Sequence, residues 1–89
     1  MNPLLKVFVN HKLSTMNASE LIKFGEKYKI TMSKPQASKV VQIIQSDRFD
    51  LFNDHIRKNV LTKITNEIDP ALSESMDQLF TRFINSQNK

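Results

Sequence analysis

The amino-acid sequence predicts an all-α protein: a compact orthogonal bundle of four to five short helices that forms a single domain over residues 1–89. One glycine and three prolines are too few for the special turn positions that an all-β or loop-rich domain needs. Apolar residues recur at helical spacing, and cap residues precede most of these segments. The chain has no internal repeat or linker, and its length supports one modest core.

The first predicted helix begins at Asn2-Pro3, where a cap residue precedes a proline at the first helical position, and runs to a turn at residues 14–16. Its apolar residues cover more than half of the helix circumference: Leu4, Leu5, Val7, Phe8 and Val9. A single contact face does not need that width. Either this helix is the central one of the bundle, the interpretation that we favour because a small core needs one, or it offers a second face to a partner chain.

Residues 17–45 predict a helix-turn-helix-like central unit. Asn17 and Glu20 form a capping box at its start. Residues with the spacing of one buried face follow: Leu21, Phe24, Gly25 and Tyr28. Gly25 is the only glycine, and its place on this face indicates close approach of a neighbouring helix, unless it is a tolerated defect.

The second helix of this unit begins near Ser33, which can cap it while Gln36 reaches back and Pro35 occupies the first turn. The same apolar spacing returns at Ala37, Val40, Val41 and Ile44. Two amphipathic faces in one short unit must close on each other and on a third element.

Residues 45–53 form the longest predicted connection, and its apolar residues are expected to plug one end of the bundle: Phe49, Leu51 and Phe52. A helix from about Asp54 to Ile68 follows, capped by Asn53 or Asp50. The last helix begins at Asp69-Pro70, and we interpret its stripe as core rather than as a groove-seeking or dimerising surface: Leu72, Met76, Leu79, Phe80, Phe83 and Ile84. Residues 85–89 are expected to fray.

Residues that could carry catalysis or bind a metal are sparse. The chain has no cysteine, and His11 and His55 do not have a two-ligand spacing. The acidic residues near position 50 lack the glycine and the final glutamate of a calcium loop, and one glycine cannot build a phosphate-binding loop. We therefore predict no enzymatic activity, no cofactor and no metal. The absence of cysteines, of a signal peptide and of a long apolar window predicts a cytoplasmic protein with no membrane partner.

Two kinds of partner remain. The apolar excess favours a protein-interaction or self-association surface, for which the candidates are Leu4, Val7, Phe49 and Phe52. The alternative is nucleic-acid binding, because residues 1–46 hold seven lysines against two glutamates. Its candidates in the central unit are Lys23, Lys27, Lys34, Gln36, Lys39 and Gln42. We rank this second, since the unit has no arginine and lysine-rich helix faces are usually only solvated.

The order of these segments also resembles a known family. The runs ASELIKFGEKYKI and TMSKPQASKVVQII, preceded by NPLLKVFVNHKLS and followed by a DxxxLFN connection and two helices, are similar to the YqfT-like small proteins of bacilli. The similarity covers nearly the whole chain and is strongest at residues 20–24 and at Gln36-Ala37. It implies a bacterial, cytoplasmic, helical protein of unknown function, and it brings no site residues.

Overall fold

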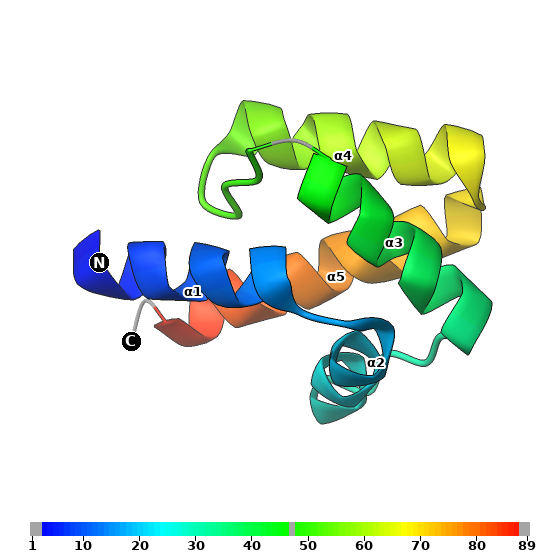
Figure 1. Ribbon diagram of the computed structural model, residues 1–89, viewed down its shortest axis with the longest axis horizontal. Helices are drawn as coiled ribbons and strands as arrows, with labels where there is room; N and C mark the ends of the chain where they lie inside the picture. Colours follow the sequence, from blue (N-terminus) through cyan, green and yellow to red (C-terminus); the bar gives the residue numbers. More distant parts are fainter. Residues whose placement is uncertain (1–2, 47, 88–89) are drawn as a thin grey trace.

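A computed structural model describes residues 3–46 and 48–87. Within these ranges the chain forms α-helices and no strand, which confirms the predicted all-α bundle (Figure 1). The helices are α1 (Pro3–Thr15), α2 (Ala18–Lys27), α3 (Lys34–Ser46), α4 (Asp54–Glu67) and α5 (Pro70–Gln87). In Figure 1, α2 is seen nearly end-on while α1 and α4 lie across the view, so α2 crosses them steeply, as in an orthogonal bundle.

Three predicted caps, Asn17, Ser33 and Asn53, start their helices where the sequence places them, whereas Asn2, the predicted cap of the first helix, lies outside the described residues. At α2, Asn17 Oδ1 accepts from the Glu20 N–H at 2.8 Å, and Glu20 Oε1 accepts from the Asn17 N–H at 3.1 Å. At α3, Ser33 Oγ accepts from the Gln36 N–H at 3.2 Å, and Gln36 Oε1 accepts from the Ser33 N–H at 2.9 Å. Asn53 caps α4. Each cap satisfies a backbone donor that has no partner within the helix, which stabilises the helix by about 1 kcal/mol.

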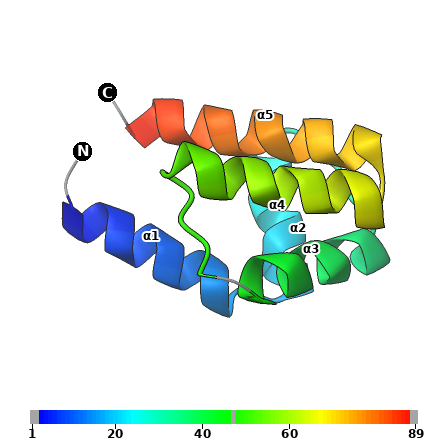
Figure 2. The same cartoon turned by 90° about the horizontal axis from the view of Figure 1, so that it is seen from above.

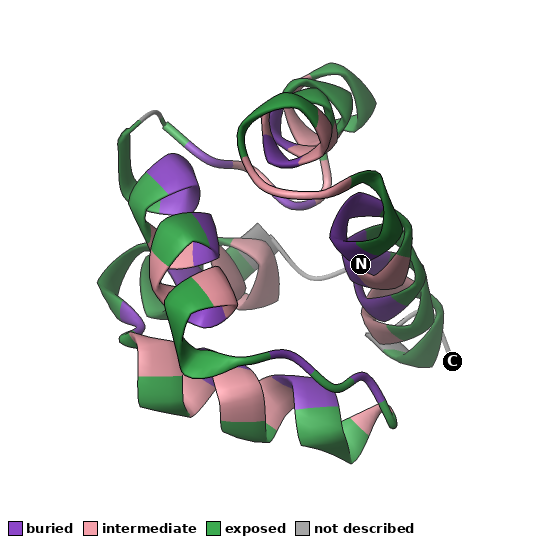
Figure 3. Cartoon of the chain, turned by 90° about the vertical axis from the view of Figure 1, so that its right-hand side faces the viewer, coloured by how far each residue is buried: buried purple, intermediate pink, exposed green. Residues whose placement is uncertain are grey.

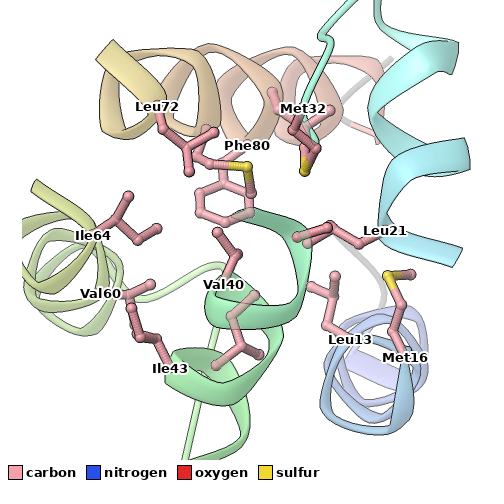
Figure 4. Close-up of a cluster of buried hydrophobic side chains, with 14 of the residues drawn as sticks. Leu13, Met16, Leu21, Met32, Val40, Ile43, Val60, Ile64, Leu72 and Phe80 are labelled. Atoms are coloured by element: carbon pink, nitrogen blue, oxygen red, sulfur yellow. The ribbon is translucent and has the colours of Figure 1, made fainter. Parts of the chain in front are cut away.

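The centre of the core is α3, and the prediction that the first helix is central is wrong. The buried residues of α3 spread over a wide arc, Ala37, Val40, Ile43 and Ile44. Figure 4 shows side chains of the other four helices converging on it, among them Leu13, Leu21, Ile64 and Phe80. Helix α1 instead lies at one end of the bundle, and its N-terminal half projects beyond α3 (Figure 1).

Helices α4 and α5 form an antiparallel pair whose facing sides are buried (Figures 2 and 3). Ser73 of α5 is buried, and its hydroxyl donates to the Leu61 carbonyl of α4 at 2.8 Å. The interpretation of the α5 stripe as core is confirmed for its buried members: Leu72, Met76, Leu79 and Phe80. Phe83 and Ile84 are only half-buried.

The connection before α4 plugs the bundle, as predicted. Phe49 and Leu51 are 7% and 0% exposed, and the Phe49 ring lies 5.7 Å from the ring of Phe80. Arg57 Nη1 donates to the Leu51 carbonyl at 2.9 Å, which fixes the connection to the first turn of α4. Phe52 is half-buried at the edge of this plug.

Gly25 lies where the chain folds back on α2. The Ile30 N–H donates to the Gly25 carbonyl at 2.9 Å, and the Lys29 N–H donates to the Glu26 carbonyl at 3.0 Å. These two bonds form a Schellman motif at the C-terminus of α2, in which Lys29 adopts the left-handed conformation with φ 62°. A Cβ at Gly25 would lie 2.9 Å from the Ile30 carbonyl oxygen and 3.2 Å from Met32 Cε. The close approach at Gly25 is therefore real, but its partner is the returning chain and not a neighbouring helix.

Candidate protein-interaction surface

Helix α1 is held to the bundle by its polar side. Asn10 Nδ2 donates to Asp50 Oδ1 at 3.0 Å, and Asn10 Oδ1 accepts from the Leu51 N–H at 2.9 Å. One turn earlier, Lys6 Nζ lies 3.5 Å from Asp50 Oδ2. Leu13, which follows Asn10 by three residues, enters the core. The side of α1 that faces the bundle therefore carries a lysine and an asparagine beside its apolar residues.

The Asp50 carboxylate is the group that two polar side chains of α1, those of Lys6 and Asn10, contact. Burial raises the pKa of Asp50, but the hydrogen bonds from Asn10 and from the Phe52 N–H, together with the charge of Lys6, outweigh burial and leave the pKa below its ordinary value. Because the fold favours the charged form, the attachment of α1 is strongest when Asp50 is ionised.

The opposite side of α1 is apolar and faces solvent. Leu4, Val7 and Phe8 are 77%, 66% and 68% exposed, and we call these three residues the outer face of α1. A surface helix normally turns its apolar side to the core and its polar side to water. Over its first two turns, α1 departs from this pattern: Leu4, Val7 and Phe8 face solvent, while its other side packs Val9 on the core and directs Lys6 to Asp50.

An apolar groove adjoins this outer face. It has a volume of about 380 Å³ and lies between α1, α2 and the C-terminal part of α5; we call it the α1–α2 groove. Its apolar lining consists of Phe8, Val9, Leu13, Met16, Phe24 and Phe83. Leu13 and Met16 are buried and form its base, whereas Phe8 belongs to both the groove and the outer face. Phe8 thus joins the outer face to the groove, whereas Leu4 and Val7 do not line the groove.

An aromatic cluster forms one wall of the groove. The Phe24 ring meets the Phe83 ring edge-to-face at 5.5 Å and the Tyr28 ring at 5.6 Å, which joins α2 to α5. Arg82 Nη1 donates to the Tyr28 carbonyl at 2.6 Å and adds a second link between the same helices. Edge-to-face pairs add about 0.5–1.5 kcal/mol each to the burial of their rings, so this wall is pre-formed.

The polar rim of the groove is positively charged. Lys12, Glu20 and Lys23 line it beside the apolar residues. Glu20 is already engaged, since it caps Asn17 and lies 3.7 Å from Lys12 Nζ. Lys23 is exposed and forms no ion pair with the residues that the structure describes. The rim therefore presents uncompensated positive charge.

The predicted interaction residues are separated by the fold. Leu4 and Val7 lie on the outer face of α1. Phe49 is buried against Phe80, so its assignment to an exposed surface is wrong; the same apolar character that suggested a surface made it a core residue. Phe52 is half-buried and does not line the groove.

Three aromatic residues of this surface are not among the interaction residues predicted from the sequence: Phe8, Phe24 and Phe83. Phe8 follows Leu4 by four residues and so extends the same helix side, a signal that was present in the sequence. Phe24 and Phe83 each have ordinary core spacing within their own helices. Their meeting at one groove depends on tertiary packing that spacing does not reveal.

The residues predicted for nucleic-acid binding do not form one patch. Lys23 lines the α1–α2 groove, whereas Lys39 and Gln42 line a separate polar recess of about 400 Å³ between α3 and α4, which Glu67 also lines. Lys27 and Lys34 are exposed.

Gln36 does not lie on the outer side of its helix, as that hypothesis required. It is half-buried, and its side-chain oxygen accepts the Ser33 N–H at the start of α3. The cap therefore competes with a base-reading role, because it engages the amide oxygen of Gln36.

A metal site requires ligating side chains that lie close together, and a membrane span requires a long apolar helix. Within residues 3–46 and 48–87, histidine, aspartate and glutamate side chains do not gather into a group of three that could hold a metal ion. Over the same ranges, each helix is too short or too polar to cross a bilayer.

Fold and surface together define a small all-α protein whose N-terminal helix turns an apolar face outward beside an apolar groove. The chain belongs to the family described as "Protein of unknown function (DUF2624)", whose model matches residues 1–84. It is similar to the uncharacterized protein YqfT of Bacillus subtilis (strain 168), with 21% identity over 80 residues that cover 90% of this chain and 95% of YqfT. The resemblance found in the sequence is thus confirmed. No solved structure shows a significant match to the chain.

Proposed function

We propose that this protein is a non-enzymatic cytoplasmic interaction module that binds a protein partner through the outer face of α1 and the α1–α2 groove. The observation that carries the proposal is the exposure of Leu4, Val7 and Phe8 directly beside an apolar groove. Contiguous apolar surface of this kind typically marks an interaction site in a soluble protein.

The orientation of α1 supports the same conclusion. Burying one leucine, valine or phenylalanine side chain stabilises a fold by about 1.5–3 kcal/mol, and three such side chains face water here. The hydrogen bonds of Asn10 and the ion pair of Lys6 with Asp50 hold α1 in this orientation. The polar contacts thus keep these apolar side chains exposed. Their burial would stabilise a complex with a partner, whereas they add little to the stability of the free chain.

The proposal is tested by site-specific photocrosslinking in cells that make the protein. A photoreactive phenylalanine analogue replaces Phe8, and the matched control carries the analogue at Asn59, an exposed position on α4. Position 8 should give discrete adducts that contain one partner, and position 59 should not. Equal adducts from both positions, or none from position 8, would contradict the proposal.

A second candidate function is nucleic-acid binding, favoured by the exposure of Lys27 and Lys34, and of Lys39 and Gln42 beside the α3–α4 recess. Its test is a salt titration of binding to a mixed-sequence DNA duplex and to single-stranded RNA, with a Lys34→Gln/Lys39→Gln variant beside the parent protein. Phosphate contacts would give affinity that falls log-linearly with salt, with a shallower slope in the variant. Identical slopes would remove these lysines from consideration.

A further inference from the structure

We infer that the occupant of the α1–α2 groove is an amphipathic helix of another protein, with large apolar side chains on one face and acidic residues beside them, and not a second copy of this chain. The inference rests on the proposed function and adds the chemistry of the partner. It follows from the charges around the groove and from the shape of its apolar lining.

The charges around the groove favour an acidic partner. Helix α1, over residues 3–15, contains Lys6 and Lys12 and no acidic residue. Lys12 is paired with Glu20 on the rim of the groove, so the net positive charge of the rim is that of Lys23. A partner helix that flanks its apolar stripe with glutamate or aspartate would meet this charge at Lys23. Such complementarity raises the association rate and excludes partners of the wrong charge.

The same charges disfavour a symmetric dimer. In a two-fold interface the same patch meets itself, so α1 of one copy would lie against α1 and its surroundings in the other. Lys12 and Lys23 would then lie in one interface with their equivalents, and two carboxylates that contact α1, those of Glu20 and Asp50, are engaged within each copy. Like charges facing each other in an interface oppose association.

The shape of the apolar surface also favours a helix. The lining of the groove on α1 runs from Phe8 through Val9 and Leu13 to Met16 just after the helix, a span of about two turns. A helix laid beside α1 would place side chains with spacing i, i+3 or i+4, and i+7 along this surface. Met16 at the base can adapt to different side chains, while Phe24 and Phe83 form the rigid wall. This combination is typical of helix-in-groove recognition.

The test uses designed peptides of about four helical turns as probes. The acidic probe carries leucine at i, i+3, i+4 and i+7, glutamate at the flanking positions and alanine elsewhere; the basic probe has lysine in place of glutamate. Binding is measured by fluorescence anisotropy at low and at physiological salt. The acidic probe should bind about tenfold more tightly than the basic one at low salt, and the difference should shrink as salt screens the charges.

Protein variants assign the binding to the groove. Lys23→Glu should reduce or reverse the preference for the acidic probe, while Lys58→Glu, an equal charge change at an exposed position on α4, should leave the preference nearly intact. Phe8→Ser should weaken both probes and keep the melting temperature, because the side chain of Phe8 is 68% exposed.

Several outcomes would overturn the inference and leave the proposed function standing. Equal binding of both probes that still depends on Phe8 would mean that charge does not select the partner. A dimer in sedimentation that Phe8→Ser dissociates would identify a second copy as the occupant. Binding to anionic vesicles that is lost in the same variant would identify a lipid surface. If neither probe binds while the crosslinks from position 8 persist, the inference is wrong and the proposed function holds; if those crosslinks are absent too, both fail.

Discussion

The replacement of Asn10 by alanine tests how α1 is attached. Asn10→Ala removes a hydrogen bond to the Asp50 carboxylate and one from the Leu51 N–H, at 3.0 Å and 2.9 Å. A hydrogen bond to a charged group contributes about 1.5–3 kcal/mol and a neutral one about 0.5–1.5 kcal/mol. Both bonds are only partly buried, so water recovers part of the loss, and we expect a cost of about 2 kcal/mol before any gain in helix propensity.

Alanine is also the better helix former, by up to about 0.7 kcal/mol, and a control must remove this gain. Asn59→Ala makes the same chemical change in an exposed position of α4. Urea unfolding followed by circular dichroism should place Asn10→Ala about 2 kcal/mol below Asn59→Ala in the free energy of unfolding. Hydrogen exchange should become faster in α1 before it does in α4 or α5.

Equal free energies of unfolding for the two variants would refute this reasoning. It would mean that the polar contacts of Asn10 contribute nothing, and that α1 is held by its other contacts, those of Lys6 and Leu13 among them. The orientation of the outer face would then need another cause.

Three further predictions concern the end of α2 and the acid limit of stability. Gly25→Ala should destabilise the fold by about 1–2 kcal/mol despite the better helix propensity of alanine, because the new Cβ would meet the Ile30 carbonyl oxygen at 2.9 Å. Lys29→Gly should stabilise it by up to about 1 kcal/mol, since Lys29 holds φ at 62°. Both free energies come from urea unfolding. Asp50→Asn should reduce the loss of stability at low pH, measured as the free energy of unfolding against pH. The pKa of Asp50 is lowered in the fold, so the ionised carboxylate contributes to stability above its ordinary pKa of about 4. This contribution is lost as the pH falls through the lower pKa of the folded state, and the variant does not have it to lose.

Each of these predictions has a contradicting result. An unchanged or raised stability in Gly25→Ala would mean that the chain at Ile30 shifts to admit the new Cβ without loss of stability. A loss of stability in Lys29→Gly would show that the lysine side chain contributes more than its backbone strain costs. If the stability curves of Asp50→Asn and the parent protein ran parallel down to low pH, the ionised carboxylate would not be what attaches α1.

Local signals predicted most of the fold. The capping boxes of Asn17 with Glu20 and of Ser33 with Gln36 act between residues three apart, so the sequence alone places α2 and α3 correctly. The same is true of Asn53 at α4. Such contacts need no knowledge of which helices meet.

The position of α1 could not be predicted in this way. Its wide apolar arc is compatible with a central helix, and only the pairing of Asn10 with Asp50, forty residues further on, turns part of that arc outward. Gln36 illustrates a different limit: its cap and its proposed outer position were both consistent with the sequence, and the structure shows that the cap takes its side chain. A contact between residues distant in sequence decided the first case, and a local cap decided the second.

The most direct test of the exposed face is thiol labelling, which the absence of cysteine in the natural sequence makes clean. Single cysteines replace Val7, which is 66% exposed, and Leu13, which is 4% exposed. In native buffer, the cysteine at position 7 should react with a thiol reagent nearly as fast as an unstructured peptide, and the cysteine at position 13 should be protected by more than about a hundredfold, as only opening of the fold exposes it. Protection of position 7 at low protein concentration would contradict the outward orientation of α1, and with it the interaction surface built on that orientation.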